Sequence, residues 1–113
     1  MSKTSEILIK VELDEENLPT KIEWDATDSG NEKFKESLAF MLSFWDKEEK
    51  VLLGLDLWTK DMMVNDMNNF FYQNFVKLAD MYKRATHNEN VILKIQNFAD
   101  EFGKAVFESE ELN

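Results

Sequence analysis

Residues 51–86 decide the fold, and they read VLLGLDLWTKDMMVNDMNNFFYQNFVKLADMYKRAT. The stretch opens with a short, almost continuous apolar run, which favours a strand over residues 51–58. The run breaks at residues 58–61, and helical spacing of apolar residues then continues from Val64 to Ala85. A helix of that length extends about 33 Å at 1.5 Å per residue. We therefore expect a strand, a turn and a long helix that together supply most of the core.

The N-terminal segment predicts a β-hairpin. Residues 6–13, EILIKVEL, and residues 21–27, KIEWDAT, each alternate apolar and polar side chains, which is typical of half-buried strands. The connector between them is polar and ends at Pro19, which interrupts a strand ladder. Because the two runs are close in sequence, antiparallel pairing is the economical arrangement.

Residues 29–45 carry a helical pattern. Ser29 and Glu32 have the spacing of a capping box, so a helix is expected to begin here. Phe40 and Phe44 lie beside the apolar stripe, where they either widen the buried face or form an exposed docking patch. The stripe itself consists of Phe34, Leu38, Met41, Leu42 and Trp45.

A last helix is expected from near residue 88, where Thr86 and Glu89 form a second candidate capping box. The predicted architecture is α+β in the order ββαβαα: a small single domain, residues 1–113, with a three-stranded antiparallel sheet packed on helices. The long helix is expected to contact the sheet through Phe71, Phe75 and Leu78. Asn74 lies in the same arc, either bonded to nearby backbone or facing a wet seam. Residues 108–113 form a short acidic tail that is expected to fray.

The composition excludes several functions. The 113 residues are 43% hydrophobic, enough for a packed core, and carry a net charge of -10. Such an acidic surface repels phosphate backbones and anionic lipids, so we expect no nucleic acid partner. It favours solubility, or a basic partner. The chain has no cysteine and no long apolar segment, so we expect no disulfide, no direct membrane insertion and a cytoplasmic location.

No residue pattern predicts catalysis, a cofactor or a metal. His87 is the only histidine and falls in the turn between two predicted helices, where capping or solvent exposure is the simpler role. The acidic residues 14–16 lack the spacing of a calcium loop. Neither GxGxxG nor GxxxxGK is present. The sequence therefore predicts a protein that is not an enzyme.

The junction after the apolar run is the best candidate for a protein-interaction surface. Trp58 could anchor a partner, with Lys60 and Asp61 supplying both signs of charge. Alternatively, Trp58 packs under the loop while Thr59 or Asp61 caps the long helix. A homodimer would cover the sheet edges and the apolar side chains. A monomer fits equally, because the core is large enough for one domain. The candidate interaction residues are Trp58, Lys60, Asp61, Leu52, Phe40 and Phe44.

Three segments together resemble the gliding-motility protein GldC family of the Bacteroidetes: residues 21–30 (KIEWDATDSG), 57–62 (LWTKDM) and 79–86 (ADMYKRAT). The resemblance implies a small soluble accessory protein of the gliding apparatus, with no activity, cofactor or catalytic residue to carry over. We expect a non-catalytic interaction module that binds gliding or secretion components. Two alternatives stay open. One is an acidic, secretion-chaperone-like protein that binds client segments, and the other is a small-molecule-binding domain.

Overall fold

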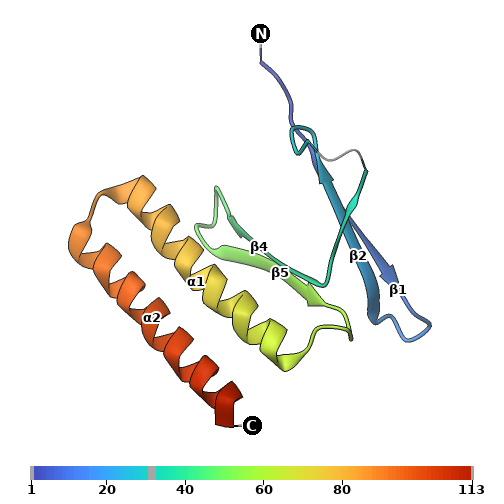
Figure 1. Ribbon diagram of the computed structural model, residues 1–113. Coiled ribbons are helices and arrows are strands. Elements are labelled where there is room, and N and C mark those ends of the chain that lie inside the picture. The colour runs from blue at the N-terminus through green and yellow to red at the C-terminus, as the bar shows by residue number, and fades with distance from the viewer. Residues whose placement is uncertain (1, 31–32, 113) are drawn as a thin grey trace. The chain divides into compact units, whose positions relative to one another are not determined.

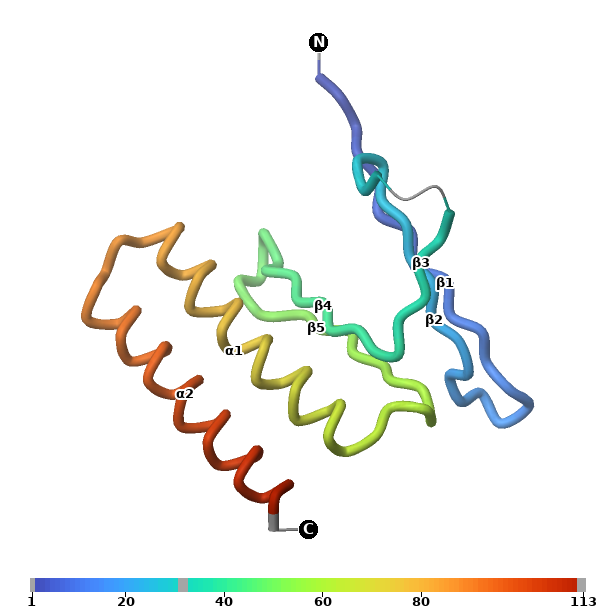
Figure 2. Tube along the Cα trace, in the orientation of Figure 1, coloured from blue at the N-terminus to red at the C-terminus, as the bar shows by residue number. Residues whose placement is uncertain are grey.

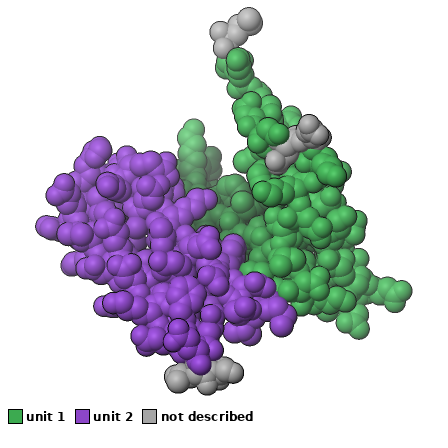
Figure 3. All heavy atoms as spheres, viewed as in Figure 1, with its two compact units in different colours: residues 1–62 green, residues 63–113 purple. Residues whose placement is uncertain are grey.

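The computed structural model describes residues 2–30 and 33–112, and its contacts divide the chain into two compact units (Figure 3). Unit 1, Met1–Met62, holds the strands, and unit 2, Met63–Asn113, holds the helices (Figure 1). The α+β class is confirmed, whereas the predicted order ββαβαα is wrong because the described elements run βββββαα. They are β1 (Ile7–Leu13), β2 (Pro19–Ala26), β3 (Lys35–Ser37), β4 (Ala39–Trp45), β5 (Leu52–Trp58), α1 (Val64–Thr86) and α2 (Glu89–Leu112).

The predicted N-terminal hairpin is confirmed. β1 and β2 pair antiparallel, with Ile9 opposite Trp24 and Val11 opposite Ile22. β3 pairs antiparallel with the other edge of β2, so the strand order is β1-β2-β3. A three-stranded antiparallel sheet therefore exists, but residues 51–58 are not its third strand. Ile22, on the central strand, is only 1% exposed.

The turn between β1 and β2 is organised by Asp14. Its carboxylate accepts the backbone N–H groups of Glu16 (2.8 Å) and Leu18 (3.0 Å). Asn17 has a left-handed φ of 64°, which asparagine tolerates better than most residues. Pro19 is the first residue of β2, a position where a missing N–H is accepted. The conformation of this turn therefore follows from its own residues.

The helix predicted over residues 29–45 is wrong, because residues 35–37 form β3 and residues 39–45 form β4. Ser29 donates its hydroxyl to Asp25 (2.9 Å), and the Glu32 expected to complete a capping box lies outside the described residues. The apolar residues fit helical spacing, but Phe40, Leu42 and Phe44 also alternate as in a strand. In β4 these three side chains lie opposite Leu57, Leu55 and Leu53 of β5, so long-range pairing overrides the local pattern.

β4 and β5 form a two-stranded antiparallel ribbon with two different faces. Only Leu38 separates β3 from β4, so the chain leaves one sheet and enters the other at a bend (Figure 2). The second face combines apolar and polar residues, including Trp58, Leu52 and Trp45. Since opposite residues share a face, the first face is entirely apolar: Phe40, Leu42, Phe44, Leu53, Leu55 and Leu57.

Unit 2 is an antiparallel helical hairpin (Figure 1). α1 begins where expected, but Asp66 supplies the capping bond, accepting the Met63 N–H at 3.2 Å, so neither Thr59 nor Asp61 does. His87 closes α1 in the left-handed conformation. Asn88 starts α2, its side chain accepting the Val91 N–H at 3.4 Å. α2 continues through the acidic residues to Leu112.

The two helices contact each other along a seam of small and aromatic residues. Phe75 packs edge-on against Phe98 and Phe102 of α2, with ring centroids 5.0 Å apart in both pairs. Tyr72 lies against Gly103, where an added Cβ would meet the ring at 2.7 Å. Asn74 donates to the Phe70 carbonyl (2.7 Å), which confirms the backbone-bonded alternative for its amide. Packing of α1 on the sheet stays a prediction.

Candidate functional site

Trp58 and Lys60 line a cavity of about 200 Å³ within unit 1. They come from the end of β5 and the residues after it, whereas the opposite wall comes from the β1–β2 turn and the start of β2. The complete lining is Asp14, Leu18, Pro19, Thr20, Trp58 and Lys60, which we call the Trp58 pocket. The fold therefore joins two segments that are far apart in the sequence.

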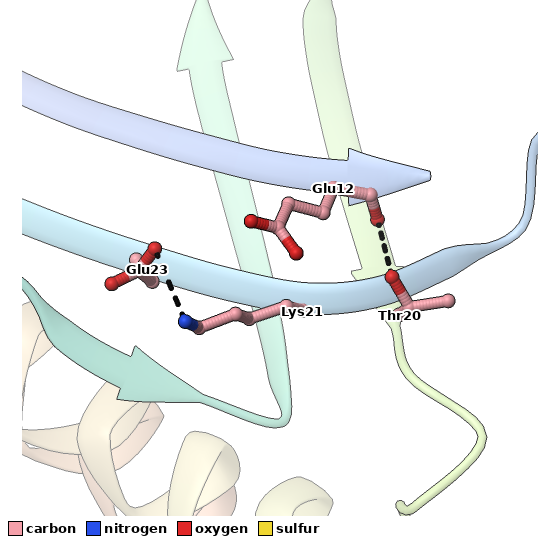
Figure 4. Close-up of polar contacts among 4 residues, drawn as sticks. All are labelled: Glu12, Thr20, Lys21 and Glu23. Atoms are coloured by element: carbon pink, nitrogen blue, oxygen red, sulfur yellow. Dashed lines mark hydrogen bonds and ion pairs between the residues drawn. The ribbon is translucent and has the colours of Figure 1, made fainter. Parts of the chain in front are cut away.

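Most polar groups of the Trp58 pocket are already bonded within the chain. The Asp14 carboxylate holds the turn, and the Thr20 hydroxyl donates to the Glu12 carbonyl at 3.2 Å (Figure 4). Lys60 differs, because neither ion pair found in residues 2–30 and 33–112 involves it. Its ammonium group is consequently available to an external carboxylate.

The apolar walls of the Trp58 pocket are partly open to solvent. Trp58 and Leu18 are each 55% exposed, and Pro19 lies between Leu18 and Thr20 in the lining. Tryptophan is enriched at protein interfaces, where its side chain serves as an anchor. The arrangement can bind an apolar side chain next to an acidic group.

The structure does not gather all six predicted interaction residues. Asp61 does not line the Trp58 pocket. Leu52 shares the face of Trp58 but lies at the other end of β5, while Phe40 and Phe44 project from the opposite face of the ribbon. Trp58 and Lys60 thus form one site, and the remaining four residues lie elsewhere in unit 1.

Sequence reasoning missed the second wall of the Trp58 pocket. Asp14 and Pro19 signal a turn, and nothing in their local pattern indicates which later segment lies beside it. Leu18 is a single apolar residue in that polar connector, and its local sequence does not indicate a binding role. The turn belongs to the β1–β2 hairpin and Trp58 to the β4–β5 ribbon, so only the arrangement of the two sheets in unit 1 brings them together.

The volume of the Trp58 pocket limits the size of the group that it can hold. The Trp58 pocket is smaller than the roughly 300–1,000 Å³ typical of small-molecule sites and matches a single side chain better. In residues 2–30 and 33–112 no three His, Asp or Glu side chains come together as metal ligands. These features suit recognition of a protein side chain.

Unit 2 has hollows of its own along the α1–α2 seam. One of them is about 410 Å³ and is lined by Tyr72, Gly103 and Phe107 together with charged residues of α2. Among those charged residues are Asp100, Glu108 and Glu111, with Lys104 as the only cation of the lining. Clustered carboxylates of this kind are usual on a solvated helix surface of an acidic chain.

No helix within the described residues has both the length and the apolar character needed to cross a membrane.

Comparison with known proteins places the chain in a family. Searches of curated proteins and of solved structures each returned no match. The family model described as "Gliding motility-associated protein GldC-like" matches residues 19–108. The matched residues include β2 to β5, most of both helices, and four of the six residues that line the Trp58 pocket, namely Pro19, Thr20, Trp58 and Lys60. Since this match covers most of the chain, the protein belongs to the GldC-like family of gliding motility-associated proteins.

Proposed function

We propose that this protein is a non-catalytic interaction module of the gliding-motility apparatus and that the Trp58 pocket binds its protein partner. The family membership supplies the process. The observation that carries the proposal is an exposed tryptophan in a cavity the size of one side chain, with the unpaired Lys60 at its rim. The expected occupant is an apolar side chain adjacent to an aspartate or glutamate.

The geometry of the pocket supports a preformed site. The wall opposite Trp58 is a turn held by two hydrogen bonds to Asp14, so little ordering is needed on binding. Lys60 adds an attraction for acidic groups on a chain whose net charge is otherwise -10. The acidic group of the partner is therefore attracted by the Lys60 ammonium, although the net charge of the protein is negative.

The test is quantitative affinity purification from a gliding host that expresses wild-type protein, Trp58→Ala or Lys60→Glu. Loss of an anchor tryptophan is expected to lower recovery of the specific partner at least about tenfold. Lys60→Glu is expected to act in the same direction, because it places a negative charge against the acidic group.

Two variants serve as matched controls. Trp45→Ala removes another exposed tryptophan (66% exposed) from the same face of the ribbon, at the end away from the Trp58 pocket. Lys47→Glu makes the same charge change in the β4–β5 loop. Both controls are expected to retain the partner. The proposal fails if Trp58→Ala and Lys60→Glu stay folded by circular dichroism and keep every partner, or if Trp58→Ala unfolds and thereby proves structural.

A second candidate function rests on the β4–β5 ribbon. Its apolar face and the open edge of β5 offer backbone and side-chain contacts to an extended segment. This would suit a secretion-chaperone-like protein. A chaperone is expected to bind unfolded segments of several proteins, whereas a gliding adaptor should bind one folded partner; peptide-array binding to the purified chain separates the two.

A further inference from the structure

β1 is an open edge of its sheet. The strand order β1-β2-β3 leaves one side of β1 without a partner strand in the described part of the chain. The Glu6 carbonyl accepts the Thr27 N–H at 3.0 Å, and the Glu12 carbonyl accepts the Thr20 hydroxyl (Figure 4). Because backbone groups alternate in an antiparallel ladder, the even-numbered residues 6–12 turn theirs toward β2. The odd-numbered residues 7–11 turn theirs outward, where another strand can bond to them.

The side chains of this edge carry one charge of each sign on the same face. Lys10 lies opposite Glu23, and Glu12 lies opposite Lys21. Lys21 forms its ion pair with Glu23 (3.7 Å), and no ion pair or hydrogen bond in residues 2–30 and 33–112 uses the Glu12 carboxylate (Figure 4). The Lys10 ammonium lies 4.2 Å from the centre of the Phe34 ring and has no carboxylate partner in those residues. Both charges are available to an incoming strand.

We propose that a second copy of the chain pairs antiparallel with β1 about a two-fold axis at Val11. This register places Lys10 of each copy opposite Glu12 of the other, so the symmetry produces two opposite-charge pairs. Val11 pairs with its own counterpart through two outward backbone bonds. The register shift of β1 lies between Glu12 and Leu13, beyond these three central positions. The dimer extends the sheet across the axis and does not depend on the Trp58 pocket.

The charges select this register over its neighbours. If the two-fold axis passes through a residue of β1, the apolar faces of the two copies lie on the same side of the joined sheet. If it passes between two residues, the apolar face of one copy continues into the polar face of the other. An axis at Lys10 puts two lysines together. An axis at Ile9 forms no opposite-charge pair and puts Glu6, just before the strand, opposite Glu12. An axis at Leu8 pairs Lys10 with Glu6 but overlaps only residues 7–9 of the strand. The Val11 axis overlaps residues 9–13, forms two opposite-charge pairs and has no like-charge pair within that overlap.

Another open edge gives no comparable discrimination. β5 also lacks an outer partner among the described strands, but Asp56 is its only charge. Its registers with a second copy therefore differ little in electrostatics, and nothing in the strand indicates what covers it. In β1, by contrast, the charges favour a second copy of the chain paired in one register.

The test uses the full chain in sedimentation velocity at concentrations up to about 100 μM, where wild type is expected to dimerise by mass action. Lys10→Glu and Glu12→Lys each convert both opposite-charge pairs into like-charge pairs, so each variant should raise the dimer Kd at least about tenfold. In an equimolar mixture, a Lys10→Glu chain presents two carboxylates to the two ammonium groups of a Glu12→Lys chain. Both opposite-charge pairs are thereby restored, so the mixture should form a heterodimer, detected by native mass spectrometry. Glu6→Lys is the matched control and should dimerise as wild type does.

The mixing step separates pairing from trivial causes. Lys10→Glu changes the residue opposite Glu23, and Glu12→Lys changes the residue opposite Lys21, so each variant also alters a cross-strand pair within the β1–β2 hairpin. Mixing the two folded variants does not change these internal pairs, so a heterodimer formed on mixing reports contacts between chains. Glu12→Lys reduces the net negative charge, so an effect of overall repulsion would strengthen association rather than weaken it. The proposal is overturned if wild type stays monomeric, if the single variants dimerise as well as wild type, or if the folded variants fail to pair when mixed. Loss of the dimer in Glu6→Lys alone would overturn the Val11 axis in favour of Leu8.

Discussion

At the residue scale, Thr59 is unusual because a polar side chain is nearly fully buried without a partner. It is 2% exposed, and its hydroxyl has no hydrogen-bond partner in the described residues. Its backbone is well used, since the N–H donates to Leu38 (2.9 Å) and the carbonyl accepts from Met62 (3.1 Å). Thr59 thus secures the bend between the strands through its backbone, while burial of its hydroxyl carries a desolvation penalty.

Replacing Thr59 with valine is expected to stabilise the protein by about 1 kcal/mol, because burying an unpaired hydroxyl costs about 1–3 kcal/mol. Urea unfolding would show a higher midpoint with an unchanged slope. Thr20→Val is the control: its hydroxyl donates to Glu12, so that variant should lose stability. A lower midpoint for Thr59→Val would mean that the hydroxyl is paired in solution.

At the element scale, the α1–α2 seam depends on the absence of a side chain at Gly103. A Cβ there would lie 2.7 Å and 2.9 Å from two ring atoms of Tyr72, closer than van der Waals contact allows. Tyr72 also packs edge-on against Phe107, with centroids 5.5 Å apart. The ring is therefore held between two residues of α2 and has little room to move.

Gly103→Ala is expected to destabilise the protein by about 1 kcal/mol, since overpacking of roughly 1–3 kcal/mol exceeds the helix propensity gained from alanine. In a Tyr72→Ala background the same change should instead stabilise the protein, and thermal unfolding of the four chains of this cycle measures the reversal. Gly54→Ala is the control, because its Cβ would meet only the Leu42 carbonyl at an ordinary 3.6 Å. Equal effects of Gly103→Ala in both backgrounds would contradict the role of the ring.

The elements also show what the sequence could and could not predict. The hairpin, β5 and both helices follow from alternation or helical spacing over segments long enough to distinguish the two. Residues 34–45 satisfy both patterns, and the strand is selected by β5, which supplies leucines opposite Phe40 and Phe44. In the Trp58 pocket, Trp58 and Lys60 are the lining residues that the sequence alone proposed as interaction residues. The β1–β2 turn beside them was not predictable, because its position depends on the arrangement of the two sheets rather than on local sequence.

At the scale of the whole molecule, a large negative charge coexists with many exposed apolar side chains. The net charge is -10 and the isoelectric point is about 4.5. Within the described residues, Ile7 is 74% exposed, Trp45 66% and Leu52 65%. Charge repulsion therefore opposes indiscriminate association of these apolar surfaces, so that any pairing of copies needs specific contacts.

The protein is accordingly expected to be least soluble near pH 4.5, where the net charge vanishes. Turbidity measured from pH 7 downward should rise sharply as that value is approached, and it should fall again at lower pH as the chain becomes positive. A Leu52→Lys variant, which replaces one exposed leucine by a charge, should show a smaller maximum. If turbidity stays constant as the pH is lowered from 7 through 4.5, net charge does not control the solubility of this protein.

The order of the elements has a consequence for synthesis of the chain. The element pairs in most extensive contact are β1 with β2, β2 with β3, β4 with β5, and α1 with α2, all of them sequence neighbours. Every strand can therefore pair before residue 63 leaves the ribosome. At about 5–20 residues per second the helices follow several seconds later. During that interval the nascent chain consists of strand segments alone, and the pairing of β4 with β5 brings Phe44 opposite Leu53 before either helix is complete.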